Sequence, residues 1–277
     1  MMDHVRVTRK VRDTPTVFSL YFNWNRDVEP GQFVMVWVPG HSEVPMSLSQ
    51  TGKEKCLTIK MYGDTTKAMD ALEPGDFIYI RGPYGKPFSR VKGKTLLIGG
   101  GSGMASLRPM INEDSTGILA ARGKEELLFE NEFHDGKAIC VTEDGSRGIK
   151  GIITAGIDSV DLSGFSMIYV CGPERMLYAV YKNIQGKTEN VEFSLERSMK
   201  CGIGLCDSCS VDYPPMGLEN NGRNVSRSLL HSNRFSDCTS GPFLKDSFHG
   251  VSILIKNARC KNSRCFKRNS TCFNTYA

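Results

Sequence analysis

Residues 94–106 read KTLLIGGGSGMAS, an apolar run that passes through glycines into residues that favour a helix. Such a strand–glycine–helix unit is typical of nucleotide-binding α/β domains, because glycine lets a pyrophosphate approach the N–H groups at the helix start. The stretch lacks the full G-x-G-x-x-G spacing, so a plain strand–helix turn remains an alternative. The candidate residues for binding a dinucleotide here are Gly99, Gly101, Ser102 and Gly103.

The residues that follow alternate between apolar runs and helix formers. The runs GILAAR (117–122), KAICVTED (137–144) and SMIYVCG (166–172) predict strands, and KEELLFENEF (124–133) and ERMLYAVYKNIQ (174–185) predict helices. This alternation indicates βαβ units and a parallel sheet. Ligands of such sheets bind at the carboxyl ends of the strands. Further candidates for the dinucleotide are therefore Cys171, Gly172 and Pro173, although plain burial of the thiol is the alternative for Cys171.

The part of the chain before residue 90 is predicted to form strands instead. Short apolar or alternating segments are separated by the turn signals EPGQ, VPGH, EPGD and GPYG, a pattern typical of an antiparallel barrel or sandwich. Small and hydroxyl residues gather beside the expected strand ends. Together these segments could cradle a phosphate and a flat ring: VPMSLS (44–49), YGDTTKAM (62–69) and RGPYGKPF (81–88).

Three of the ten cysteines lie within nine residues, as Cys201-x4-Cys206-x2-Cys209. This is the spacing of the plant-type 2Fe–2S loop, which takes its fourth ligand from further along the chain. A structural zinc site is the alternative, but it usually uses two close ligand pairs. The fourth ligand is predicted to be Cys238, with Cys260, Cys265 and Cys272 as rivals in a tail that offers no core. The isolated Cys56 and Cys140 are predicted to be buried small hydrophobes.

The charge distribution argues against nucleic-acid or membrane binding. The net charge is +5, but the segment from Lys245 onward carries seven Lys or Arg and one Asp. The rest of the chain therefore offers no basic stripe. No apolar run reaches the length of a membrane span, and the first residues lack the apolar core of a signal peptide. We expect a cytoplasmic protein whose last residues, 251–277, form a basic tail without structure.

The motifs together resemble the ferredoxin–NAD(P) reductase superfamily, over about residues 3–210. Within it, the chain is similar to the electron-transfer subunits of dihydroorotate dehydrogenases of the archaeal type. The cysteine loop after a reductase core is the most specific of the motifs. The resemblance is carried by PGQFVMVWVPG, PMSLS, GDTTKAM, RGPYGKPF, LIGGGSGMASL, VTEDGSRGIKG, YVCGPERML and ERSMKCGIGLCDSC.

The resemblance implies three domains: an FAD-binding β-barrel (1–92), an NAD-binding α/β domain (93–190) and a 2Fe–2S domain (191–250). The tail (251–277) lies outside the resemblance. The FAD contacts that it implies are Pro45, Met46, Ser47, Leu48, Gly63, Thr65, Thr66, Gly82 and Gly85. Two residues depart from the family pattern. Val44 stands where a flavin-binding Arg is usual, and Thr65 replaces a small residue. Lys67 or Arg81 is a candidate to supply the missing positive charge.

The implied function is electron transfer without a catalytic acid or base. A partner subunit with FMN oxidises dihydroorotate to orotate in pyrimidine biosynthesis, and electrons pass through the cluster and FAD to NAD. Two copies of each chain are expected to assemble as a heterotetramer. The alternatives are a flavin subunit of a cytoplasmic hydrogenase, a ferredoxin:NADP oxidoreductase subunit, or a zinc-bearing regulatory or scaffold protein on a degenerate reductase core.

Overall fold

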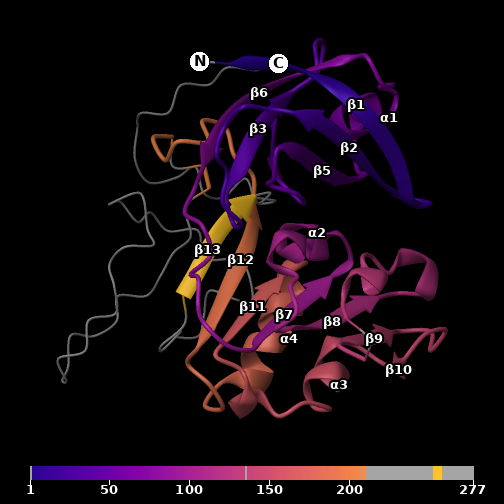
Figure 1. Cartoon of the computed structure of the whole chain (residues 1–277), viewed down its shortest axis with the longest axis vertical. Helices are drawn as coiled ribbons and strands as arrows, with labels where there is room; N and C mark the ends of the chain where they lie inside the picture. Colours follow the sequence, from indigo (N-terminus) through magenta and orange to yellow (C-terminus); the bar gives the residue numbers. More distant parts are fainter. Residues whose placement is uncertain (1, 135, 207, 210–251, 258–277) are drawn as a thin grey trace, which may run out of the picture.

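Two sheets, one antiparallel and one parallel, organise the chain (Figure 1). The structure is a computed structural model and describes residues 2–134, 136–206, 208–209 and 252–257. The antiparallel sheet is built from the first part of the chain and the parallel sheet from the part after residue 94, in agreement with the change of pattern in the sequence. The two candidate nucleotide motifs therefore lie on different sheets.

The antiparallel sheet has six strands in the order β4-β3-β6-β1-β2-β5. Its edge strands β4 and β5 contact each other, so the sheet curls back on itself. Alternating apolar residues such as Val5 and Val7 point into its core, which Phe18, Leu20 and Phe22 fill. The strands are β1 (Asp3–Thr14), β2 (Val17–Asn23), β3 (Phe33–Trp37), β4 (Val44–Ser47), β5 (Glu54–Lys60) and β6 (Phe77–Tyr84), with helix α1 (Asp64–Asp70) between β5 and β6.

The parallel sheet has the order β10-β9-β8-β7-β11-β12-β13. Successive residues of its central strands face opposite sides, so that Leu96 and Ile98 pack under α3 and α4 while Leu97 packs under α2. The strands are β7 (Thr95–Gly100), β8 (Ser115–Ala121), β9 (Ala138–Thr142), β10 (Ile149–Lys150), β11 (Met167–Cys171), β12 (Val191–Arg197) and β13 (Ser252–Asn257), and the helices are α2 (Met104–Leu107), α3 (Ile153–Ile157) and α4 (Glu174–Ile184).

The helix predicted over residues 124–133 is wrong. Two single 3-10 turns, Lys124–Glu126 and Glu130–Glu132, occupy this segment, and Phe129 between them has a φ of 61°. The helix-forming composition is overridden because Leu128 and Phe133 are both buried against the α2 side of the parallel sheet. A short irregular connection places both side chains there.

The parallel sheet also extends beyond residue 190, where the sequence analysis placed the end of its domain. Strand β12 pairs with β11 from Val191 onward, and β13 then pairs with β12. The expected absence of structure after residue 250 is therefore wrong for Ser252–Asn257. The run SILI supplies enough β-forming residues for one edge strand within an otherwise polar stretch.

The connection between the sheets is anchored to the parallel sheet at Ser89. The Tyr169 hydroxyl donates a hydrogen bond to the Ser89 carbonyl, and the Ser89 N–H donates to the buried Glu192 carboxylate at 3.1 Å. The neighbouring Phe88 ring packs edge-on against Tyr169, with the centroids 5.2 Å apart. These contacts hold the two sheets in a fixed relation.

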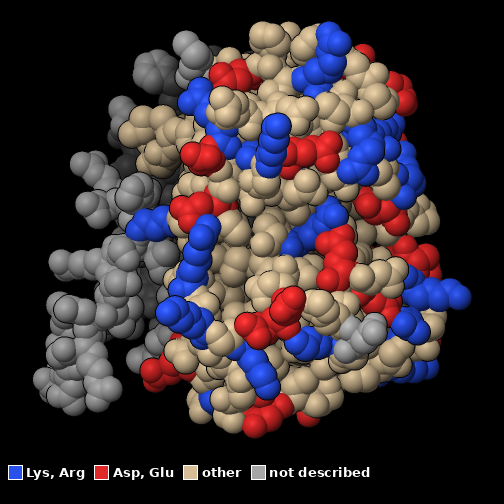
Figure 2. All heavy atoms as spheres, in the orientation of Figure 1, with Lys and Arg blue, Asp and Glu red and all other residues tan. Residues whose placement is uncertain are grey.

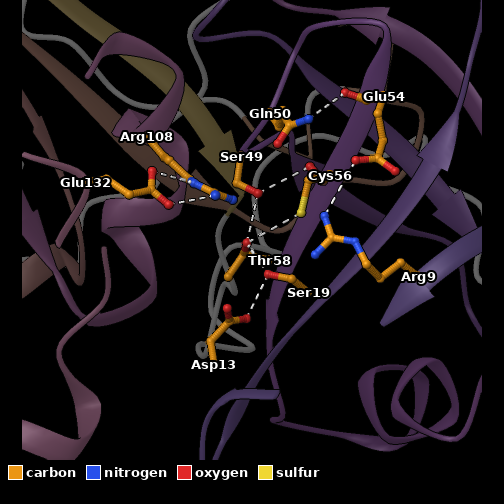
Figure 3. A network of polar contacts seen from close by, with 10 residues as sticks. All are labelled: Arg9, Asp13, Ser19, Ser49, Gln50, Glu54, Cys56, Thr58, Arg108 and Glu132. Atoms are coloured by element: carbon orange, nitrogen blue, oxygen red, sulfur yellow. Dashed lines mark hydrogen bonds and ion pairs between the residues drawn. The ribbon is translucent and has the colours of Figure 1, made fainter. Parts of the chain in front are cut away.

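A polar network lies beside this boundary (Figure 3). On the antiparallel sheet, the Ser19 hydroxyl donates to the Asp13 carboxylate at 2.7 Å and lies 2.7 Å from the Thr58 hydroxyl. From the parallel-sheet side, Arg108 forms an ion pair with Glu132 at 2.6 Å, and both charges act on Asp13. Asp13 is therefore a half-buried carboxyl at the meeting point of the two sheets.

Asp13 gives the stability of the protein a testable pH dependence. Burial raises the pKa of the Asp13 carboxyl, so the folded protein binds this proton more tightly than the unfolded chain does. The stabilising contribution is present at acidic pH and is lost as pH rises through the raised pKa. We expect Asp13→Asn, whose amide oxygen still accepts the Ser19 hydrogen bond, to become more stable relative to wild type as pH rises from 4 to 7.

Asp3 provides the matched control for this pH measurement. The hydrogen bond from Trp24 lowers the pKa of Asp3, so its contribution is present at neutral pH and lost on acidification. Asp3→Asn should therefore show the opposite trend in melting temperatures measured across the same pH range. Parallel pH profiles for Asp13→Asn and wild type would contradict the Asp13 prediction.

On the face drawn in Figure 2, acidic and basic side chains are interspersed, and the described residues form no large patch of one charge there. Among the described residues, no helix combines the length and apolarity that crossing a membrane requires.

Candidate functional site

The glycine loop and the Cys-Gly-Pro segment meet at the carboxyl ends of two neighbouring strands. Cys171 of β11 pairs with Gly99 of β7, so the two motifs lie side by side although these two residues are 72 positions apart in the sequence. A Cβ on Gly103 would lie 2.4 Å from the Cys171 carbonyl oxygen and 2.6 Å from the Gly172 Cα. Only glycine lets the loop approach the neighbouring backbone this closely.

The other predicted dinucleotide residues surround this contact. Gly101, Ser102 and Gly103 form a 3-10 turn before α2, and Pro173 directly precedes α4. The Cys171 side chain is fully buried in the apolar cluster on the α2 side of the sheet. Its thiol is therefore buried, as are those of Cys56 and Cys140, and the backbone of residues 171–173 is what this segment presents at the carboxyl edge.

Strand β3 brings two of the three predicted flavin segments together. Its Phe33 lies opposite Ser47 of β4 on one side and Tyr84 of β6 on the other. Two positions along, Met35 lies opposite Pro45 and Arg81 in the same way. The PMS segment and the RGPYG segment therefore lie on strands that flank β3. Pro45 and Ser47 lie beside Met35 and Phe33, whereas Met46 packs against the core of the antiparallel sheet. Gly82 and Gly85 both lie against Phe33 or its backbone.

The start of α1 joins this group. The Thr65 hydroxyl donates to the Ser42 carbonyl at 3.3 Å, which places the helix start beside the segment that leads into β4. The Thr66 hydroxyl accepts hydrogen bonds from the Tyr62 and Gly63 N–H groups, so this side chain fixes the turn before the helix. Thr65, which replaces the small residue of the family, thus ties the start of α1 to the residues just before the VPMSLS segment.

Arg81 does not carry an unbalanced charge that could replace the arginine missing at Val44. Its guanidinium forms two hydrogen bonds to the Glu43 carboxylate, at 2.6 and 2.7 Å. Lys67, the other candidate, is exposed on α1, and no ion pair involves it within the described residues. Of the two candidates, the geometry therefore favours Lys67.

The cysteine loop follows β12 and lies beside β3 and β6 (Figure 1). The Leu205 N–H donates to the Cys201 sulfur at 3.4 Å, and the Ser208 hydroxyl lies 3.2 Å from the Cys206 sulfur. Burial opposes ionisation of Cys206, but hydrogen bonds from Ser208 and Cys201 outweigh it and lower its pKa to about 6. This environment favours the thiolate, the form that binds metals.

The described part of the loop does not close into a full metal site. No group of three ligand side chains converges within the described residues. Cys201 and Cys206 lie close enough to interact, and Cys209 is three residues further on. The predicted fourth ligand, Cys238, and its rivals Cys260, Cys265 and Cys272 lie outside the described residues.

Comparison with known proteins finds close relatives, although no family model matches the chain. A probable dihydroorotate dehydrogenase B (NAD(+)) electron transfer subunit from Thermoplasma acidophilum is 48% identical over 210 residues, covering 76% of this chain and 84% of that protein. The protein of the same description from Methanocaldococcus jannaschii is 38% identical over 215 residues, covering 75% and 82%.

Solved structures with the same arrangement of sheets support the fold. An NADH-dependent reduced ferredoxin-NADP oxidoreductase, described for flavin-based electron bifurcation, matches with a TM-score of 0.65 at 27% identity, covering 74% of this chain and 80% of that one. Phthalate dioxygenase reductase matches with a TM-score of 0.58 at 15% identity, covering 72% and 69%. At that identity the second likeness concerns the fold alone.

Proposed function

The chain belongs to the family of dihydroorotate dehydrogenase B electron-transfer subunits, and we propose that it carries electrons from the FMN of a catalytic subunit through a 2Fe–2S cluster and FAD to NAD. It is an oxidoreductase subunit of pyrimidine biosynthesis. The observation that carries the proposal is the 48% identity over 210 residues, which amounts to 76% of this chain. Bound flavin exchanges an electron pair with the nicotinamide and single electrons with the cluster.

The residues at the carboxyl edge of the parallel sheet fit a dinucleotide. The backbone of residues 101–103 and 171–173 meets there, and Gly103 removes the Cβ that would keep the two apart. The adjacent start of α2 adds N–H groups of the kind that bind phosphate. We assign NAD to Gly99, Gly101, Ser102, Gly103, Gly172, Pro173 and the backbone of Cys171.

The face shared by β4, β3 and β6 fits a flavin. Gly63 at its rim has open space beside it, Gly82 and Gly85 let β6 pass close to Phe33, and hydroxyl groups from β4 and α1 lie around the face. These groups orient the flavin by hydrogen bonds rather than by proton transfer, so the chain supplies no catalytic acid or base. We assign FAD to this face, with contacts from Pro45, Met46, Ser47, Leu48, Gly63, Thr65, Thr66, Gly82 and Gly85.

The cysteine loop fits a 2Fe–2S cluster. Its three thiols have the plant-type spacing, and the Leu205 N–H already points at the Cys201 sulfur, as amides do around cluster ligands. We assign the fourth position to Cys238, because CTSGPF retains the Cys, the Gly-Pro and the Phe of the family segment Cys-x-Asp-Gly-Pro-Val-Phe, although after a longer insert.

The assignment of Cys238 is tested by two matched substitutions. We expect Cys238→Ala to lose the iron of the cluster, because a 2Fe–2S centre with three thiolates is not retained, whereas Cys260→Ala keeps it. The measurement is iron and acid-labile sulfide per chain, together with visible absorption. Full iron content in Cys238→Ala, or iron loss in Cys260→Ala, would refute the assignment.

The catalytic partner is proposed to dock beside the cysteine loop, in an assembly of two copies of each chain. Ile203 and Leu205 are 53% and 82% exposed, so the loop presents apolar side chains next to the cluster ligands. The test is reconstitution of the purified chain with an FMN-containing dihydroorotate dehydrogenase catalytic subunit. The pair should reduce NAD when dihydroorotate is added, and neither chain alone should do so.

A further inference from the structure

The cysteine loop is tied to the flavin-binding face by one side chain, Arg81 of β6. Arg81 donates from Nε and Nη2 to the two carboxylate oxygens of Glu43, at 2.6 and 2.7 Å. This two-pronged geometry fixes the plane of the guanidinium. Both side chains are about four-fifths shielded from solvent, since 20% and 22% of each is exposed. Glu43 therefore sets the direction in which the third nitrogen points.

The third nitrogen reaches the first cysteine of the loop. Arg81 Nη1 donates to the Cys201 carbonyl oxygen at 2.6 Å, across 120 positions of sequence, and Nη2 lies 3.5 Å from the Lys200 carbonyl. The Tyr84 hydroxyl, 3.4 Å from Nη1, completes the surroundings of this nitrogen. The hydrogen bonds to Glu43 raise the pKa of the guanidinium further above its ordinary value, so Arg81 stays charged.

The next residue of the loop lies flat against the same strands. Gly202 has a φ of +72°, and a Cβ there would lie 2.8 Å from the Met35 Cγ and 3.6 Å from the Arg81 Nη1. Met35 is fully buried and is the cross-strand neighbour of both Arg81 and Pro45. The backbone of residues 201–202 therefore lies against Met35 and Arg81, and the cross-strand neighbour of Met35 is Pro45, a residue assigned to FAD.

We propose that Arg81, oriented by Glu43, is a positioning residue that fixes Cys201 against the flavin-binding face and thereby sets the geometry of electron transfer between cluster and flavin. The inference rests on the proposed function, because it takes Cys201 as a cluster ligand. Arg81 acts through the carbonyl of that ligand rather than through its sulfur, and it belongs to the RGPYG segment, in which Gly82 and Gly85 are assigned to FAD. Partners that orient metal ligands in this way typically change affinity or activity by about 10–100-fold when they are replaced.

The test compares Arg81→Gln with wild type in the full-length protein. In the cofactor-free form, hydrogen exchange of the amides at residues 198–206 should accelerate at least about ten-fold, because the anchor of the loop is lost. In the cofactor-loaded form, stopped-flow mixing with NADH should show flavin reduction at the wild-type rate and cluster reduction about 10–100-fold slower. The EPR signal of the protein after reduction with dithionite shows whether the cluster is still present.

Matched variants separate positioning from folding. Glu43→Gln leaves Arg81 in place but removes the charge that orients it, and it should change both readouts in the same direction by a smaller factor. Arg81→Lys keeps the charge and should recover at most part of the cluster-reduction rate. Arg26→Lys, which alters another ion pair of the antiparallel sheet, with Asp3, should change neither.

The outcomes distinguish this inference from the function on which it rests. Both Arg81→Gln and Glu43→Gln could show hydrogen exchange in the loop and cluster reduction at the wild-type rates. That result would overturn the role of Arg81 while leaving the electron-transfer function intact. A wild-type protein that binds neither flavin nor iron would instead overturn the proposed function, and the role of Arg81 with it.

Discussion

Cys206→Ser is expected to abolish the 2Fe–2S cluster while leaving the flavin in place. Cys206 is the loop thiol whose surroundings favour the thiolate, with a pKa lowered to about 6, and serine cannot supply an equivalent anionic sulfur ligand. Iron should fall from about two per chain to less than a tenth of that. NADH should still reduce the flavin, but electron transfer to the catalytic subunit should stop.

The matched control is Cys56→Ala. Cys56 is fully buried in β5 of the antiparallel sheet, where its sulfur lies 3.9 Å from the Thr58 hydroxyl, and it is not part of the cysteine loop. We expect this variant to lose some stability through the small cavity that it creates, yet to keep its iron. Iron analysis, flavin content and EPR on both variants make the comparison. Undiminished iron in Cys206→Ser would contradict the cluster assignment.

Gly103→Ala is expected to destabilise the protein and to remove its reaction with NADH. The new Cβ would lie 2.4 Å from the Cys171 oxygen and 2.6 Å from the Cys171 carbonyl carbon, and backbone atoms cannot yield as a flexible side chain can. Overpacking of this kind costs about 3 kcal/mol, which corresponds to a loss of about 10 °C in melting temperature for a chain of this size. The loop would also shift away from the carboxyl ends of β7 and β11.

Gly164→Ala is the control for the effect of a methyl group alone. A Cβ there would meet no atom within 4 Å. Its melting temperature and its rate of flavin reduction by NADH should both remain close to wild type. If Gly103→Ala matched this control in both measurements, the close approach of the glycine loop to β11 would have no part in stability or dinucleotide binding.

It could be predicted that an antiparallel sheet precedes a parallel sheet in the chain, because each strand segment carries the hydrophobic pattern of its own kind of sheet. The run from Thr95 into glycines and the later apolar runs predict parallel strands, and their carboxyl ends necessarily meet at one edge. That geometry brings Gly99 and Cys171 together, as the structure shows. The same local reasoning placed Cys201 and Cys206 in one loop from their spacing.

Features that depend on distant partners could not be predicted. The segment 124–133 has helix-forming residues, yet Leu128 and Phe133 are drawn into the core and prevent the helix. The contact of Arg81 with Cys201 joins residues 120 positions apart, and nothing in the local sequence around either one indicates it. Strand β13 depends on an available edge at β12, which only the assembled sheet provides.

The most direct test of the central claim is an anaerobic titration of the purified full-length protein with NADH, followed by optical absorption and EPR. The account predicts that NADH bleaches the flavin bands and generates the EPR signal of a reduced 2Fe–2S cluster, since both centres lie on one electron path. A colourless protein that contains one zinc per chain and shows no spectral change with NADH would contradict it.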